Sequence, residues 1–159
     1  MSSQFEIKGL PESYEIQRSF DSEEYLDAVL RCRVYLESWL GEYIFVLLFP
    51  STEEANEENR RFIQERFSEM FFQISWLKEK EYISEKDYIN LDKIRLFCDK
   101  VIARGEVFSV VSFENLNKYL ETAVYYCNKI KNLTNQVIQN TMLKDCLLYT
   151  SPSPRDLST

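Results

Sequence analysis

The stretch DSEEYLDAVLRCRVYLESWLGEYIFVLLFP, from Asp21 to Pro50, decides the expected fold. Its apolar residues recur at intervals of three and four, which is the period of one face of an α-helix. They are Tyr25, Ala28, Val29, Cys32, Leu36, Trp39, Leu40, Tyr43, Ile44 and Leu47. Asp21 followed by Glu24 matches a capping box, which satisfies free backbone N–H groups in a first turn, and Pro50 ends the pattern. The sequence therefore predicts one long amphipathic helix over this stretch.

A second helix is predicted between the turn at Pro50 and Leu77, with Ser51 or Thr52 as its N-cap. Apolar residues at helical spacing run from Phe62 to Leu77. The first turns are acidic, as the helix dipole favours, through Glu53, Glu54, Glu57 and Glu58. A carboxylate metal site is the alternative for these glutamates, but the chain has no histidine to complete an E-x-x-H pair.

Two further helices are predicted, each opened by a serine. Ser84, with Asp87 three residues later, caps a helix that stops at Gly105. Ser112 caps a fourth, whose apolar stripe continues to Val137. Four amphipathic helices with short connections predict an all-α fold, an up-and-down antiparallel four-helix bundle. We assign the bundle to residues 21–145 and expect residues 1–20 to be irregular, apart from a turn of helix in PESYEIQRSF.

The composition limits the classes of protein to which the chain can belong. Gly 3 and Pro 4 in 159 residues agree with long helices, and the longest apolar run, Tyr43 to Phe49, is far below the roughly 20 residues of a membrane span. We therefore expect a cytoplasmic protein that does not contact a membrane. Cys32, Cys98 and Cys127 fall on apolar stripes, which predicts buried, inert thiols. Without a CxxC pair or a histidine, we expect no zinc site, disulfide framework or cofactor.

The last fourteen residues, CLLYTSPSPRDLST, break the trends before them by bringing Ser, Thr and Pro together. The first eleven resemble the conceptual translation of a transposase sequencing adapter. We interpret residues 146–159 as a non-native tail on a chain from a fragmentary assembly, and we place the end of the natural sequence near Asp145.

The net charge of -7 argues against general electrostatic binding of nucleic acid. The charge is uneven, because residues 1–90 carry 10 Lys/Arg against 19 Asp/Glu, whereas residues 91–145 carry 8 against 6. This asymmetry could steer a partner, and ordinary solvated helix faces are the alternative.

Residues 21–140 resemble the HEPN (higher eukaryotes and prokaryotes nucleotide-binding) helical domains, many of which are metal-independent ribonucleases in toxin–antitoxin and antiphage systems. EEYLDAVLRCRVYLESWLGEYIFVLLFP is similar to their long first helix, and FSEMFFQISWLKEKEYISEKDYINLDKIRLF is similar to the run into their third. CDKVIARG stands where the family carries R-N-x-x-x-H followed by a basic residue and Gly.

The chain departs from this motif at its reactive positions. Cys98 stands at the Arg position, Asp99 at the Asn position and Ala103 at the His position. Cleavage of RNA through its 2′-hydroxyl needs a base with a near-neutral pKa and a fixed cation for the phosphate, which His and Arg supply. The chain has no histidine to replace the lost base. We therefore expect a non-catalytic binding or regulatory module, with no catalytic residue.

A basic cluster remains on the same helix. It consists of Lys93, Arg95, Lys100 and Arg104. It could bind a phosphate or an acidic partner, and the alternative is that these side chains pair with Asp92, Asp99 and neighbouring acids on a solvated face.

The resemblance also implies a dimer through the motif helix, which would place Ile94, Cys98, Val101 and Ile102 near an interface. A homodimer or a complex with a protein partner is expected, with nucleic acid or a nucleotide as the weaker alternative.

Two other readings stay open. One is an active nuclease or nucleotide-binding enzyme that uses Asp99, Lys100 and Arg104. The other is an unrelated helical scaffold, which a structure would favour if Cys98 and Ala103 did not share an exposed surface.

Overall fold

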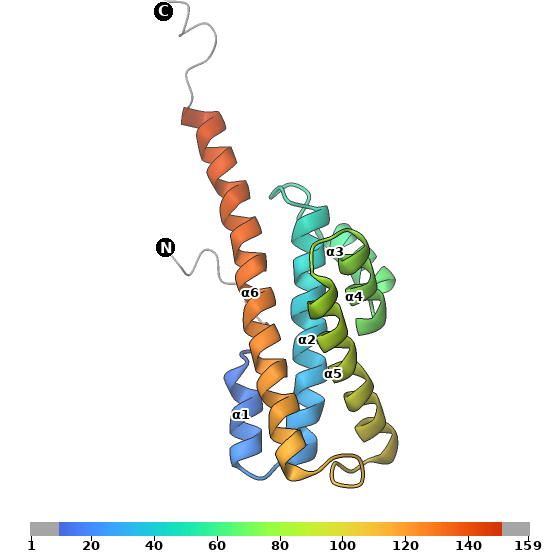
Figure 1. The fold of residues 1–159 in the computed structure, drawn as a ribbon. Helices are drawn as coiled ribbons and strands as arrows, with labels where there is room; N and C mark the ends of the chain where they lie inside the picture. Colours follow the sequence, from blue (N-terminus) through green and yellow to red (C-terminus); the bar gives the residue numbers. More distant parts are fainter. Residues whose placement is uncertain (1–9, 151–159) are drawn as a thin grey trace, which may run out of the picture.

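The computed structural model describes the backbone of residues 10–150 and the side chains of residues 10–144, and every regular element in that range is helical (Figure 1). The elements are α1 (Tyr14–Asp21), α2 (Tyr25–Leu48), α3 (Glu57–Arg66), α4 (Met70–Glu79), α5 (Glu85–Arg104) and α6 (Phe113–Thr150). The all-α prediction is confirmed. The described residues form six helices, however, and not the four expected.

The central element is α2, which packs against each of the other five helices. Figure 1 shows α1 and α6 on one side of α2, and α3, α4 and α5 on the other. The largest fully buried side chains come from all the helices except the short α3: Ile16, Leu36, Leu40, Ile44, Met70, Ile74, Leu77, Leu91, Ile94, Leu116, Leu120 and Ile130. The core therefore surrounds α2, as the wide apolar stripe of its sequence indicates.

The predicted capping box at Asp21 is wrong. Asp21 is the last residue of α1, and Glu24, which precedes α2, makes no side-chain cap hydrogen bond. The chain reverses at Glu23, which has a left-handed φ of 61°. The N–H of Glu24 donates to the carbonyl of Ser19 at 2.9 Å, and that of Glu23 donates to Phe20 at 3.0 Å, which is a Schellman closure. Two helical turns therefore occupy much of the segment expected to be irregular.

The second predicted helix is two helices. Its N-cap is Asn56, whose side chain accepts from the N–H of Asn59 at 2.9 Å, and not Ser51 or Thr52. Residues 67–69 interrupt it between α3 and α4, where Glu69 is extended with φ -118° and ψ 143°. The amide of Gln73 donates to the carbonyl of Phe67 at 3.0 Å. This side chain satisfies a backbone group that a continuous helix would have bonded internally.

The predicted starts of the last two helices, and the predicted end of the first of them at Gly105, are confirmed. Ser84 accepts a hydrogen bond from the N–H of Asp87 at 3.1 Å, and Gly105 ends α5 with a left-handed φ of 71°. Ser112 accepts from the N–H of Asn115 at 3.3 Å. The backbone of α6 continues as helix through residues 146–150, the first part of the segment interpreted as a tail, and residues 151–159 lie outside the described range.

A polar contact fastens the start of α5 to the middle of α6. Asp87 is 8% exposed and accepts from Lys129 Nζ at 2.9 Å and from the Tyr126 hydroxyl at 3.0 Å. Burial by itself would raise the pKa of Asp87, but the hydrogen bonds from Lys129 and Tyr126 outweigh it, so its pKa lies below the usual range. The carboxylate is therefore held ionised in the fold.

Candidate functional site

The predicted site residues are divided between the two sides of α5. The buried side carries Leu91, Ile94, Phe97, Cys98 and Val101. The opposite side, called the basic face below, carries the exposed residues Lys93, Leu96, Lys100, Ala103 and Arg104. Cys98 and Ala103 are five positions apart, or about 140° around the helix axis. The structure does not bring them together on one surface.

Cys98 is a core residue. Its side chain is 0% exposed, and its Sγ lies 3.9 Å from the carbonyl oxygen of Val29 on α2. Burial raises the pKa of Cys98 to about 12, so the thiol stays neutral at physiological pH. Cys32 and Cys127 are also free and buried, which confirms the prediction for all three cysteines. None of them supplies a cation or a reactive thiolate.

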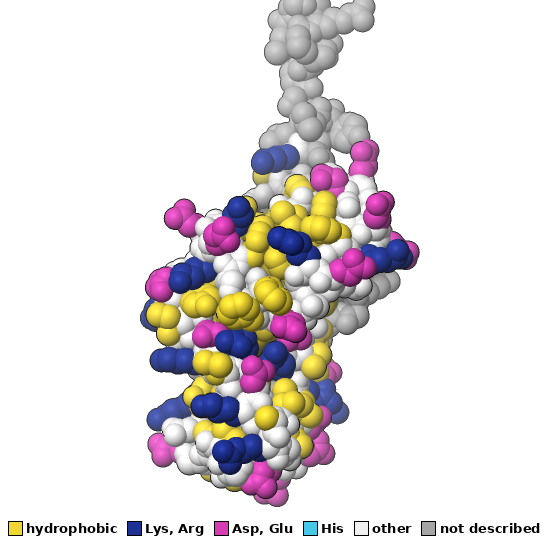
Figure 2. Space-filling model, turned by 90° about the vertical axis from the view of Figure 1, so that its right-hand side faces the viewer, with side chains coloured by type: hydrophobic (Ala, Val, Ile, Leu, Met, Phe, Trp, Pro, Cys, Tyr) yellow, Lys and Arg dark blue, Asp and Glu magenta, His cyan; other side chains and the backbone are white. Residues whose placement is uncertain are grey.

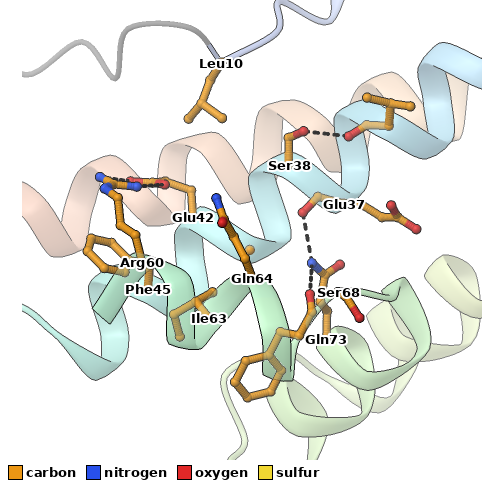
Figure 3. A pocket seen from close by; sticks show the side chains of 13 residues that line it. Leu10, Glu37, Ser38, Glu42, Phe45, Arg60, Ile63, Gln64, Ser68 and Gln73 are labelled. Atoms are coloured by element: carbon orange, nitrogen blue, oxygen red, sulfur yellow. Dashed lines mark hydrogen bonds and ion pairs between the residues drawn. The ribbon is translucent and has the colours of Figure 1, made fainter. Parts of the chain in front are cut away.

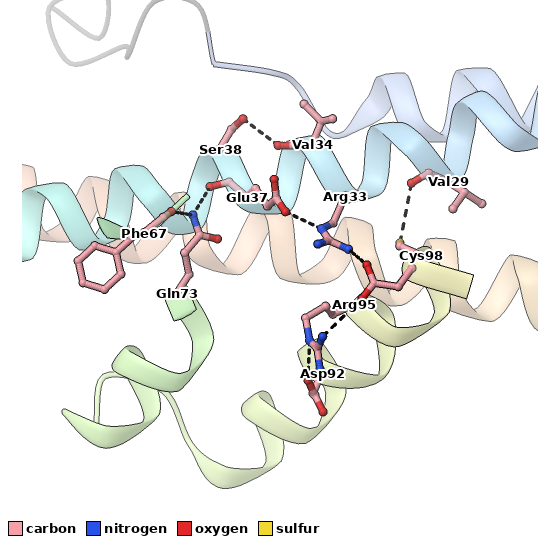
Figure 4. Close-up of polar contacts among 11 residues, drawn as sticks. Val29, Arg33, Val34, Glu37, Ser38, Phe67, Gln73, Asp92, Arg95 and Cys98 are labelled. Atoms are coloured by element: carbon pink, nitrogen blue, oxygen red, sulfur yellow. Dashed lines mark hydrogen bonds and ion pairs between the residues drawn. The ribbon is translucent and has the colours of Figure 1, made fainter. Parts of the chain in front are cut away.

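Asp99 and Arg95 belong to a line of ion pairs between α5 and α2, which we call the charge ladder (Figure 4). Asp99 is paired with Arg33 of α2, and its other oxygen lies 3.4 Å from Arg95 Nη1. Arg95 also donates to Asp92 at 2.8 Å, and its guanidinium lies 5.2 Å from the centre of the Phe71 ring. The pairing alternative is therefore confirmed for Arg95, which is committed within the fold.

The other three predicted cations remain on the surface. Lys93, Lys100 and Arg104 are exposed, and none of them forms an ion pair with another residue of the range 10–144. Figure 2 views the molecule from the side of α3, α4 and α5, and shows Lys and Arg side chains interspersed with hydrophobic and acidic ones. These cations are free to meet a charge from outside the chain.

The basic face borders a hollow of about 400 Å³ between α5, the loop after Gly105 and the start of α6. Lys93, Leu96 and Lys100 line one side of it. Phe97 and Tyr119 also line the hollow, and their rings stack 4.2 Å apart with an interplanar angle of 3°. The remaining lining residues are Val110, Val111, Ser112 and Asn115. The hollow thus combines two ammonium groups with an apolar and aromatic lining.

Three of the four residues expected near a dimer interface are buried within this chain. Ile94, Cys98 and Val101 are 2%, 0% and 0% exposed, because they pack into the core of this chain. Ile102 alone remains on the surface, at 47% exposed. An interface through α5 would have to use other side chains.

No family model, no curated protein and no solved structure matches this chain. The resemblance to HEPN domains therefore stays a prediction from sequence.

The described residues show neither a membrane span nor a metal centre. Within residues 10–150, no helix has both the length and the apolar composition that crossing a bilayer requires. No group of three or more His, Cys, Asp or Glu in the described part of the chain is arranged to hold a metal ion. Of the acidic run, Glu57 and Glu58 fall in the first turn of α3, as the dipole reading predicts, whereas Glu53 and Glu54 precede that helix.

Sequence reasoning missed a second hollow, on the side of α2 that faces α3 and α4. Gln73, assigned only to an apolar run, lies at its edge and is 3% exposed. Gly41, in the middle of α2, also lines it. A glycine inside a long helix is unfavourable, and that local cost was the available signal that Gly41 occupies a special position.

Proposed function

We propose that this chain is a non-catalytic helical binding module whose basic face recognises an acidic, amphipathic segment of a protein partner. The observation that carries the proposal is the set of three exposed cations on one face of α5, Lys93, Lys100 and Arg104, which form no ion pair within residues 10–144. Leu96 and the adjoining hollow supply apolar surface between these charges. Acidic residues on the partner would meet the cations, and its apolar residues would enter the hollow.

The absence of histidine from the chain supports a binding role over an enzymatic one. Burial raises the pKa of both Cys98 and Cys127 to about 12, so neither offers a thiolate. Asp99 accepts from two arginines in the charge ladder, so both of its oxygens are already engaged within the fold. The other two residues of the enzymatic alternative, Lys100 and Arg104, supply positive charge but no general base.

The charge of the whole chain supports selectivity. At a net charge of -7, most of the surface repels an acidic partner, and the basic face is a local exception. Exposed charges are screened beyond about 8 Å at physiological ionic strength. Binding should therefore be oriented by the basic face and should weaken as salt is added.

The resemblance to HEPN domains extends this proposal to a biological setting. A HEPN-like module without its catalytic motif would act as a regulatory partner in a toxin–antitoxin or defence system. The pattern of residues 21–140 supports this setting, and the neighbouring reading frames in the parent genome would test it.

The experiment uses a fluorescently labelled 15-residue peptide with Glu and Leu on opposite helical faces as the probe, and fluorescence anisotropy as the readout. Exposed ion pairs each contribute about 0.2–1 kcal/mol, so the double variant Lys93→Glu/Lys100→Glu should weaken binding by about tenfold or more. The matched control, Arg18→Glu/Lys144→Glu, makes the same change of charge at exposed positions on α1 and α6.

Two results would overturn the proposal. Equal losses in the double variant and its control would mean that only total charge matters, and an absence of peptide binding would remove its basis. A parallel incubation with labelled RNA tests the enzymatic alternative. Cleavage that is abolished by Lys100→Ala or Arg104→Ala would replace the binding role with a nuclease.

A further inference from the structure

The hollow beside the basic face is lined by charges of one sign. Its two charged side chains are Lys93 and Lys100, and the described residues that line it include no Asp or Glu. This lining stands out in a chain that has 26 acidic residues against 19 basic ones. A group that enters the hollow meets two ammonium groups and no carboxylate, so the site favours an anion over a cation.

The second hollow does not share this property. It is a cleft of about 460 Å³ between α2 and the α3–α4 pair (Figure 3), and its charged side chains are of both signs. Glu42 accepts from Arg60 at 3.0 and 3.3 Å, and Glu37 is paired with Arg33. Because these charges have partners within the chain, the cleft selects no charged ligand in the way that the hollow beside the basic face does.

The two lysines of the basic face have a spacing that a second helix can match. Lys93 and Lys100 are seven positions apart on α5, which corresponds to about 10.5 Å along the helix axis. A helix lying along α5 presents side chains on its facing side at the same seven-residue interval. An extended segment repeats each face every second residue, or about every 6.6 Å, and therefore matches this spacing less closely.

Apolar surface lies between the two lysines. Leu96 comes three positions after Lys93 and four before Lys100, is 45% exposed and lines the hollow. Tyr119 lines it from α6, is partly exposed and stacks on the ring of Phe97. Because this stacking holds the Tyr119 ring in place, an aromatic side chain that enters the hollow meets a fixed apolar wall.

The same line of residues continues beyond the lysines at both ends. Ile89, one turn before Lys93, is 44% exposed, and Arg104, one turn after Lys100, is also exposed. Intervals of three and four residues along α5 place all of these side chains, with Leu96 among them, on one side of the helix. A partner helix can therefore follow α5 over several turns.

We propose that the segment recognised by the basic face is a helix with one aromatic residue between two acids that are seven positions apart. The aromatic side chain enters the hollow against Leu96 and Tyr119, and the two carboxylates pair with Lys93 and Lys100. This assignment rests on the proposed binding of an acidic segment at the same face. It adds the conformation, the anchor and the spacing of that segment.

The test uses three fluorescently labelled 15-residue peptides in an Ala/Gln background. The first has Glu at its fourth and eleventh positions and Phe at its eighth, so that all three share one helical face. The second has the same composition, but its glutamates stand at the sixth and thirteenth positions, on the opposite face. The third is the first with Phe replaced by Ala. Fluorescence anisotropy with the full chain should show the first binding about tenfold more tightly than either of the others.

Charge reversal identifies the pairs of residues in contact. Lys100→Glu should weaken binding of the first peptide by about tenfold, because one attraction becomes a repulsion. Replacing one of the two peptide glutamates by lysine should restore binding to this variant, whereas replacing the other should weaken it further. With Lys93→Glu the two replacements should exchange their effects.

A pair of tyrosine variants tests the hollow. Tyr119→Ala should weaken binding of the first peptide several-fold and leave binding of the third unchanged, because the third has no aromatic anchor. The matched control is Tyr125→Ala, which removes an exposed tyrosine of α6 that does not line the hollow. It should not change the affinity for either peptide. Circular dichroism confirms that each variant is folded and that the peptides are equally helical.

The possible failures separate this assignment from the proposed function. Equal affinity for the first and second peptides, with both weakened by Lys93→Glu/Lys100→Glu, would overturn the helical spacing and leave an acidic partner at the basic face. Equal rescue by the two peptide replacements, or equal losses in Tyr119→Ala and Tyr125→Ala, would also overturn the assignment. An absence of binding by all three peptides would overturn both.

Discussion

The cleft between α2 and α4 differs from the basic face of α5 in how its polar side chains are held. In the cleft, Gln73 and Glu42 are buried and bonded to fixed partners. On the basic face, Lys93 and Lys100 are exposed and form no ion pair within residues 10–144. A buried polar group contributes to the stability of one arrangement, whereas an exposed one contributes little to stability and is available to a partner. This difference can be tested by measuring the free energy of unfolding of variants, from buried positions to exposed ones.

The largest loss is expected at Gln73. Gln73→Ala removes two hydrogen bonds to backbone carbonyls, and the buried carbonyl of Phe67, in the break between α3 and α4, loses this donor. We expect the free energy of unfolding to fall by about 2–4 kcal/mol, measured by urea denaturation. The loosened junction between α3 and α4 should also show faster amide hydrogen exchange than α6. A loss below about 0.5 kcal/mol would contradict the role assigned to this side chain.

Asp87 should have the next largest effect, because its carboxylate is buried while its partner Lys129 is partly exposed. Asp87→Asn should lower the free energy of unfolding at pH 7 by about 1–3 kcal/mol. The folded-state pKa is depressed, so this contribution is fully present above the unfolded pKa of about 3.9 and is lost as pH falls through the folded value.

The pH dependence gives a separate check on Asp87. Urea denaturation of the wild type and of Asp87→Asn should show a difference that shrinks below about pH 4. A difference that stays constant down to pH 2 would mean that the ionised carboxylate does not account for it.

A gain in stability is expected at Gly41. Gly41→Ala places a methyl group 3.4 Å from Gln73 Nε2, an ordinary contact, and restricts the unfolded chain. We expect the free energy of unfolding to rise by about 0.5–1 kcal/mol, seen as a higher urea midpoint with an unchanged slope. Destabilisation instead would show that the cleft is packed more tightly than its volume indicates.

The smallest effect is expected on the basic face. Lys93→Ala and Lys100→Ala should each change the free energy of unfolding by less than about 0.5 kcal/mol, because neither side chain has a partner within the described range. The same variants should weaken binding of the acidic peptide. A large loss of stability would mean that these lysines are structural, and the contrast with the cleft would disappear.

Local signals explain which parts of the fold could be predicted. Ser84, Gly105 and Ser112 act on backbone groups within a few residues, so α5 and the start of α6 were placed correctly from sequence. The break between α3 and α4 could not be found this way. Gln73 bonds to the carbonyl of Glu37, 36 residues away, and no local periodicity records that contact.

The prediction around the turn at Glu23 was wrong for a different reason. A left-handed residue after a helix is usually Gly, and here a glutamate adopts it, so the end of α1 carried no recognisable stop signal. Asp21 was consequently read as the start of the next helix.

The candidate site was also predictable where local spacing decides it, and not where a long-range contact does. Helical spacing placed the cations Lys93, Lys100 and Arg104 on the polar side of α5, and all three are exposed. Arg95 has the same residue type but different surroundings, because Asp99 and Arg33 bring it into the charge ladder. Arg33 and Asp99 are 66 positions apart, so the pairing depends on how α2 and α5 pack.

The charge ladder also fixes the register of α5. A slide of α5 along α2 by one helical turn, about 5.4 Å, would separate Asp99 from Arg33 and would also disrupt the packed core beneath α5. With the register set in this way, the backbone positions of Lys93, Lys100 and Arg104 keep a constant spacing on one face of α5. An approaching partner therefore meets a template whose spacing is set before contact, and spends little free energy on ordering it.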